Sequence, residues 1–170
     1  MCGNDESALE VLFTRQSCRK FTSQAVLKGE LEKIVNAGRL AATARNVQPW
    51  HFVVVTEPGR LKELASLTGN NGKFIADAAA CIVVLCEEVT YYVEDGSAAT
   101  QNLLNAAHAL GLGGCWVAGD KKPYAESIVK FLDAPKNMKL VSLVPIGHPA
   151  EQTPRATKKN LAEVLHWEKI

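Results

Sequence analysis

The segment Ala80-Cys81-Ile82-Val83-Val84-Leu85-Cys86 decides the fold class of this chain. It is short, wholly apolar and rich in β-branched side chains, which is typical of a strand that is covered on both faces. Residues 52–56, which lie between Pro49 and Pro58, and residues 140–146 have the same character. We therefore predict three central strands.

Amphipathic helices are predicted between and around these strands. Apolar side chains recur along one face of residues 8–14 and of residues 30–42. Residues 96–110 carry a longer apolar stripe that ends at Gly111, a residue type that commonly terminates helices. A short helix is predicted over residues 124–132. Helices that alternate with strands indicate a mixed helix and sheet protein.

The composition limits the class of protein. The 170 residues are 47% hydrophobic and 22% charged and contain no linker or repeat, so we expect one globular domain over residues 1–170. The formal net charge is +1 without a long run of like charges, which argues against nucleic-acid binding. The longest apolar run, residues 78–86, is far shorter than the ~20 residues that span a bilayer, and Asp5 and Glu6 are unlike a signal peptide. We expect a cytoplasmic protein that does not bind a membrane.

The last part of the chain is a polar tail with an apolar end. After Pro149 the sequence offers no core of its own until it reaches large apolar side chains, which are Leu161, Val164, Leu165 and Trp167. Such a tail either stays in water or lies on another surface, and large exposed aromatic side chains are costly. We favour docking, on a second subunit.

A candidate phosphate site follows the first predicted helix. Arg15, Ser17 and Arg19 stand at every second position, so an extended backbone places two guanidinium groups and a hydroxyl on one side. Arginine offers planar bidentate donors to a phosphate, and serine adds one more hydrogen bond. The alternative is a solvated basic turn, and spacing alone leaves both interpretations open.

Two further segments are candidates for binding a flat ring. Asn46 and Gln48 lie in a polar turn before Pro49, and their carboxamides suit the alternating donors and acceptors of a flavin pyrimidine edge, although such amides more often satisfy loop backbone. Residues 110–119 are rich in glycine, which lets backbone N–H groups approach a ring or an anion. They lack the G-x-G-x-x-G register of a dinucleotide site, and the alternative is a helix end that leads into a strand.

Taken in order, the motifs resemble those of the FMN-dependent nitroreductase family, and the resemblance covers nearly the whole chain. The matching segments are Arg15-Gln16-Ser17-Cys18-Arg19-Lys20-Phe21, Ala42-Thr43-Ala44-Arg45-Asn46-Val47-Gln48-Pro49-Trp50, Gln101-Asn102-Leu103-Leu104, Leu110-Gly111-Leu112-Gly113-Gly114-Cys115-Trp116, Ile146-Gly147-His148-Pro149-Ala150-Glu151 and a final Leu161-Ala162-Glu163-Val164-Leu165-His166-Trp167.

The resemblance implies an α+β fold with a mixed, largely antiparallel sheet flanked by helices and an extended C-terminal tail exchanged between the subunits of a homodimer. It also implies FMN at the dimer interface. The residues that it assigns to the cofactor are Arg15, Gln16, Ser17, Arg19, Thr43, Asn46, Gln48, Asn71, Trp116, Val117, Ala118, Gly119 and Lys158. Of these, Thr43, Asn46 and Gln48 are expected to reach the flavin of the partner subunit.

The implied chemistry is that of an FMN-dependent oxidoreductase. A hydride passes from NADH or NADPH through flavin N5 to a small nitroaromatic or quinone-like acceptor in a ping-pong cycle, without a catalytic side chain or a metal. Alternatives are another reaction of the same fold (dehalogenation, azoline oxidation or flavin breakdown), a non-catalytic flavin-binding module, or a scaffold without flavin. Thr43, His148 and Lys158 depart from the family's usual serine, aromatic residue and arginine, and the short chain leaves the choice of acceptor open.

Overall fold

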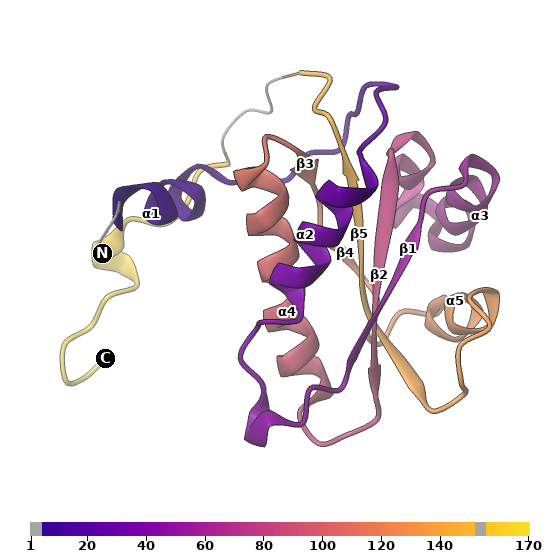
Figure 1. Cartoon of the computed structure of the whole chain (residues 1–170). Helices are drawn as coiled ribbons and strands as arrows, with labels where there is room; N and C mark the ends of the chain where they lie inside the picture. The colour runs from indigo at the N-terminus through magenta and orange to yellow at the C-terminus, as the bar shows by residue number, and fades with distance from the viewer. Residues whose placement is uncertain (1–4, 152–155) are drawn as a thin grey trace.

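An antiparallel sheet lies at the centre of the molecule. The computed structural model describes residues 5–151 and 156–170 (Figure 1). In this part of the chain the sheet follows the order β1-β2-β5-β3, and β4 pairs with β5 beside β3. The strands are β1 (Trp50–Val55), β2 (Ala80–Glu87), β3 (Gly113–Gly114), β4 (Val117–Ala118) and β5 (Met138–Gly147). Every pair of these strands is antiparallel.

The central strand β2 is buried on both faces, as its sequence predicts. Its side chains alternate between two apolar clusters, and none of the seven from Ala80 to Cys86 is more than 2% exposed. One cluster contains Ala80, Ile82, Val84 and Cys86, and the other contains Cys81, Val83 and Leu85. A continuous apolar run therefore fills two cores at once.

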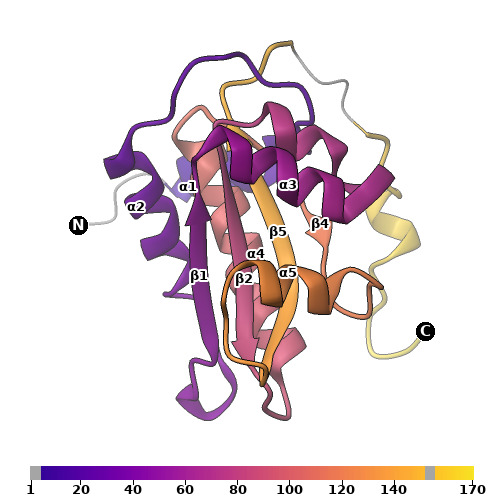
Figure 2. The same ribbon diagram turned by 90° about the vertical axis from the view of Figure 1, so that its right-hand side faces the viewer.

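Helices cover both faces of the sheet (Figures 1 and 2). On one face, α2 (Lys28–Gly38) packs against the long helix α4 (Tyr92–Ala109). The other face is covered by α3 (Pro58–Thr68), the 3-10 helix η3 (Lys73–Asp77) and α5 (Ala125–Phe131). This arrangement confirms the predicted fold class, a largely antiparallel sheet flanked by helices.

A helix is predicted over residues 30–42, and the prediction of its last turn was wrong. The helix ends at Gly38, because the amides of Leu40 and Ala41 bond to the carbonyls three residues before them, which tightens and closes the helix. Gly38 itself sits against Leu103 of α4, where an added Cβ would stand 2.6 Å from the leucine side chain. Helix α2 is thus short and closely packed.

Both ends of the described chain extend away from the layered body in Figure 1. Helix α1 (Asp5–Thr14) exposes Leu9 and Leu12, and all of residues 156–170, which include η4 (Leu161–Glu163), are exposed. Trp167 is 78% exposed. Among the described residues, no helix combines the length and the apolar character that crossing a bilayer requires.

Candidate functional site

The N-terminal segment that carries the arginines lies against the glycine-rich turn. Ser17 forms a parallel bridge with Gly114, and the backbone N–H of Cys18 donates to the Gly114 carbonyl at 2.9 Å. An added Cβ on Gly114 would contact Leu104 and Ile146 at 3.2 and 3.1 Å. The absence of a side chain at Gly114 therefore lets the arginine segment and the glycine-rich turn pack against each other next to the core.

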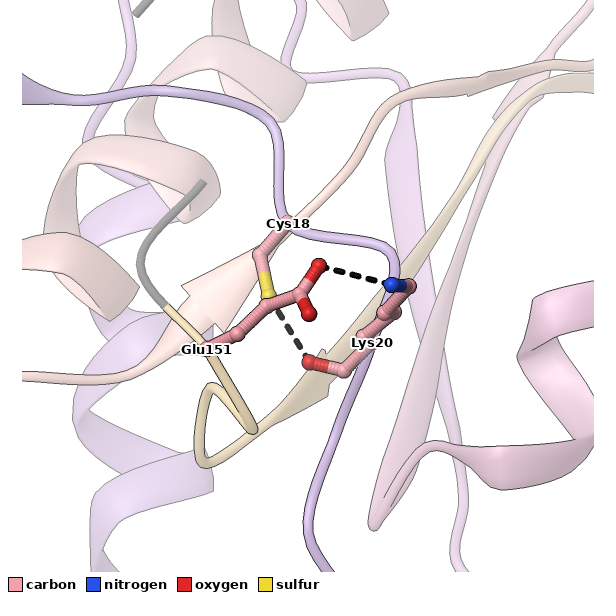
Figure 3. Close-up of polar contacts among 3 residues, drawn as sticks. All are labelled: Cys18, Lys20 and Glu151. Carbon is pink, nitrogen blue, oxygen red and sulfur yellow. Dashed lines mark hydrogen bonds and ion pairs between the residues drawn. The ribbon is translucent and has the colours of Figure 1, made fainter. Parts of the chain in front are cut away.

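The turn after β5 holds the other side of the same segment (Figure 3). The Lys20 carbonyl accepts from the Ala150 N–H at 3.0 Å, and the Lys20 ammonium pairs with Glu151 at 2.8 Å. The Cys18 thiol donates to the Lys20 carbonyl at 3.2 Å. The extended backbone of this segment is thus fixed from two sides, as a preorganised binding site requires.

The structure brings Arg15, Ser17 and Arg19 together around Cys115. Burial raises the pKa of the Cys115 thiol, whereas the positive charge of Arg19, a hydrogen bond with Ser17 and the charge of Arg15 each lower it. The Arg19 guanidinium also lies 5.9 Å from the ring centre of Phe74 in η3. Two positive charges and a hydroxyl therefore lie near the Cys115 thiol, beside the glycine-rich turn.

Gln16 does not share this side. Its side chain and that of Cys18 line a different pocket of about 420 Å³, together with His108, Leu112 and Glu151. The side-chain carboxamide oxygen of Gln16 is buried and has no hydrogen-bond partner in the described chain. The predicted cofactor role of Gln16 stays a prediction.

The segment from Trp116 to Gly119 is fixed along β5. Val117 and Ala118 form β4, and the Gly119 N–H donates to the Val141 carbonyl at 3.0 Å. Trp116 is half-buried and Val117 is buried, but Ala118 is exposed. A stretch of ordered backbone is therefore available to a flat ligand at Ala118.

The turn over residues 43–48 (the 43–48 turn), which contains η1 (Ala44–Asn46), is held by the start of α4. The Thr43 hydroxyl donates to one oxygen of Asp95, and the Ala44 N–H donates to the other, both at 2.9 Å. Within the turn, the Gln48 carboxamide donates to the Asn46 side-chain oxygen at 3.1 Å. Thr43, Asn46 and Gln48 are thus grouped together.

This turn lies at the opposite end of α4 from the arginine segment (Figure 1). Thr14, next to Arg15, contacts His108 at 2.8 Å, and His108 is thirteen residues beyond Asp95 in the same helix. At 1.5 Å per residue, that is about 20 Å along the helix axis. Within one chain, the structure does not bring the 43–48 turn to the arginines.

The two remaining predicted residues are exposed. Asn71 ends η2 (Gly69–Asn71), three residues before the Phe74 ring that Arg19 contacts. Lys158 lies in the C-terminal tail, and within the described residues no ion pair joins it to a carboxylate. Their predicted roles stay predictions.

The sequence analysis missed Asp95, a buried carboxylate in the first turn of α4. The signal that could have revealed it is its position four residues before Ala99, on the apolar stripe of the helix. An acid on such a stripe needs hydrogen-bond partners, and Asp95 finds them in the 43–48 turn.

The charges of the site favour an anion. Within residues 5–151 and 156–170, neither Arg15 nor Arg19 pairs with a carboxylate. The same part of the chain contains no cluster of three or more His, Cys, Asp or Glu side chains that could bind a metal ion. The arginines therefore keep their donors available for an anionic ligand.

The chain is similar to known proteins over most of its length. The Nitroreductase family model matches residues 12–81 and 60–148. An Archaeoglobus fulgidus protein named "Putative NADH dehydrogenase/NAD(P)H nitroreductase" is 32% identical over 154 residues, which cover 86% of this chain and 88% of that protein. A Bacteroides thetaiotaomicron protein of the same name has a crystal structure with a TM-score of 0.91 and 28% identity, which covers 98% of this chain and all of that chain.

A third similar structure is an FMN-dependent nitroreductase from Clostridium difficile R20291. It has a TM-score of 0.89 and 27% identity, and it covers 95% of this chain and 99% of that chain. The family model spans more than half of the sequence and includes the arginine segment, the 43–48 turn and the glycine-rich turn. The resemblance of the ordered motifs is thus confirmed, and the chain belongs to the Nitroreductase family.

Proposed function

We propose that this protein is an FMN-dependent oxidoreductase that passes a hydride from NADH or NADPH to small nitroaromatic or quinone-like acceptors. The observation that carries the proposal is that the segment with Arg15, Ser17 and Arg19 is bound directly to the glycine-rich turn at Gly114. The similar Clostridium difficile protein is named an FMN-dependent nitroreductase, which supports the choice of cofactor.

The donor set fits the terminal phosphate of FMN. A phosphate monoester carries nearly two negative charges and three strong acceptor oxygens. Arg15 and Ser17 supply charged and neutral donors for it, and Lys158 adds a positive charge if the tail returns to the site. Backbone for the isoalloxazine ring would come from Trp116, Val117, Ala118 and Gly119.

Bound FMN would supply the redox chemistry, hydride transfer at its N5 atom between a nicotinamide donor and the acceptor in a ping-pong cycle. The residues of the chain bind and orient. Arg19 would place positive charge beside the pyrimidine edge of the flavin and so favour the negative charge of the reduced form, and Asn71 would lie near the same edge. No side-chain acid or base is required.

The active form in this proposal is a homodimer with exchanged C-terminal tails. The 43–48 turn and the arginine segment lie at opposite ends of α4, so one flavin contacts both most simply if they come from different subunits. A second subunit would also cover the exposed apolar side chains of α1 and the tail, among them Leu12, Leu161 and Trp167.

The central experiment is a flavin assay of the purified protein. We expect a yellow protein that releases FMN on heating, is bleached by NADH or NADPH under nitrogen and is reoxidised by a quinone. Bound FMN that neither nicotinamide reduces would contradict the reductase proposal. Protein that cannot be reconstituted with FMN would contradict the cofactor assignment as well.

A mixed-dimer experiment tests the shared site. Chains with Arg15→Ala are paired with chains carrying Asn46→Ala, and the mixed dimer is isolated through two different affinity tags. If the arginines and the turn act in different subunits, one site of the mixed dimer has both intact and binds FMN with wild-type affinity. If both act within one chain, neither site recovers, and the shared-site proposal is wrong.

A further inference from the structure

We propose that Asp95 is a positioning residue that holds the 43–48 turn in its binding conformation, and so controls the contact of this turn with the partner subunit's flavin. This inference deepens the proposed function and rests on it. Asp95 itself lies in α4 and only 4% of it is exposed, so it acts through Thr43 and Ala44.

The first argument is that, within the described chain, the Asp95 carboxylate takes its hydrogen bonds from the 43–48 turn. Each of its two oxygens accepts one hydrogen bond from the turn, from the Thr43 hydroxyl and from the Ala44 N–H. Within the described chain no lysine or arginine forms an ion pair with Asp95. A buried carboxylate needs such partners, so α4 and the turn depend on each other.

The second argument is a relay through Thr43. Its hydroxyl donates to Asp95 and its oxygen also accepts from the Gln48 N–H at 3.0 Å. One side chain of α4 therefore fixes the beginning of the turn directly and its end through Thr43. The side chains of Asn46 and Gln48 in this turn are exposed to solvent.

The third argument is the backbone conformation of the turn. Arg45, Asn46 and Gln48 have φ angles of 52°, 58° and 54°, in the left-handed region that favours glycine. Strained backbone of this kind persists only where surrounding contacts hold it, and it gathers at binding sites. In this turn the holding contacts are those of Asp95 and Thr43.

The test compares Asp95→Ala with Asp95→Asn. Alanine removes both acceptors, and we expect FMN binding to weaken about tenfold or more, because a small misplacement of a binding group is costly. Asparagine keeps an acceptor oxygen for the Ala44 N–H and can donate to the Thr43 oxygen, so affinity is expected to stay within about threefold of wild type. Equal FMN affinity of Asp95→Ala and wild type would overturn the proposal.

A matched control separates positioning from general stability. Ile128→Val in α5 removes one buried methylene group from the core on the opposite face of the sheet to α4. We expect this variant to lower the melting temperature without changing FMN affinity. If it weakens FMN as much as Asp95→Ala does, the effect is one of stability and the positioning role is wrong.

Amide hydrogen exchange in the flavin-free protein provides a readout that does not depend on catalysis. Asp95→Ala is expected to speed exchange at Ala44 and Gln48, whereas Thr43→Val is expected to speed it at Gln48 alone and to weaken FMN. Thr43→Val also carries the test if Asp95→Ala does not fold. Unchanged exchange at Gln48 in Thr43→Val would overturn the relay. If the variants show these exchange changes but the wild-type protein binds no FMN, only the proposed function is contradicted.

Discussion

Gly113 lies so close to Cys18 that an added Cβ on the glycine would stand 2.6 Å from the Cβ of the cysteine and 2.7 Å from its sulfur. This approach permits the hydrogen bond between the Cys18 N–H and the Gly114 carbonyl. Any larger side chain at position 113 must therefore push the arginine segment away from the glycine-rich turn.

Gly113→Ala is expected to lower the free energy of unfolding by about 1 to 3 kcal/mol, the usual cost of overpacking, and to weaken FMN binding. Urea denaturation and FMN titration measure the two effects. Gly29→Ala is the control, because nothing lies within 4 Å of an added Cβ at that exposed helical position. It should be neutral or slightly stabilising. Wild-type FMN affinity in Gly113→Ala would show that the segment tolerates displacement.

Arg15→Ala should weaken FMN directly. Loss of a hydrogen bond to a charged group costs roughly 1.5 to 3 kcal/mol, which corresponds to about a ten- to hundredfold rise in Kd. Arg39→Ala is the matched control, since Arg39 directly follows α2 and donates to Asn36 of that helix. Fluorescence titration with FMN checks both variants. Equal affinities of the two variants would remove Arg15 from the phosphate site.

The sheet could be predicted because β2 is apolar on both faces, a pattern that few other structures produce. Helix α3 was not predicted. Its buried side chains Leu61, Leu64 and Ala65 are few among polar neighbours, and a helix of 11 residues is stabilised mainly by tertiary packing, here against η3 and α5. Local patterns thus reveal elements with continuous apolar faces better than short surface helices.

For the site, the sequence could predict the extended segment that carries Arg15, Ser17 and Arg19, because alternation along a strand is a local rule, and Ser17 does form a bridge with Gly114. The hold of Asp95 on Thr43 joins residues 52 apart in the sequence, and no local pattern indicates such a contact. The separation of the 43–48 turn from the arginines likewise follows from the packing of α4 and not from sequence spacing.

The Glu57 side chain caps α3. It accepts from the Gly59 and Arg60 N–H groups, both at 2.8 Å, and these hydrogen bonds hold the pKa of Glu57 below its usual value. A lowered pKa means that the cap is fully effective above the usual pKa of glutamate and is lost as the pH falls through the lowered pKa. Glu57→Ala should therefore reduce the melting temperature at neutral pH, and the difference from wild type should shrink in acid. Glu63→Ala is the control on the same helix, because the capping side chain is Glu57.

The Tyr92 hydroxyl donates to Asp120 at 2.7 Å and so links the start of α4 to the segment after β4. This hydrogen bond, with smaller contributions from burial and the negative charge of Asp120, raises the pKa of Tyr92 to about 12. The unfolded chain loses the tyrosine proton near its ordinary pKa of about 10, so it binds fewer protons than the folded protein above that pH. Stability from this group is therefore complete below about pH 10 and declines as the pH rises towards 12.

Tyr92→Phe removes the titrating hydroxyl. We expect a lower melting temperature than wild type at neutral pH, because the Asp120 bond is lost, and a shallower decline of stability at alkaline pH. Urea denaturation at a series of alkaline pH values measures the slope, and ultraviolet titration of tyrosinate follows ionisation of the folded protein. Tyr91→Phe is the neighbouring control, since the Tyr91 side chain is exposed. An equal alkaline slope in wild type and Tyr92→Phe would show that the hydrogen bond with Asp120 does not persist in solution.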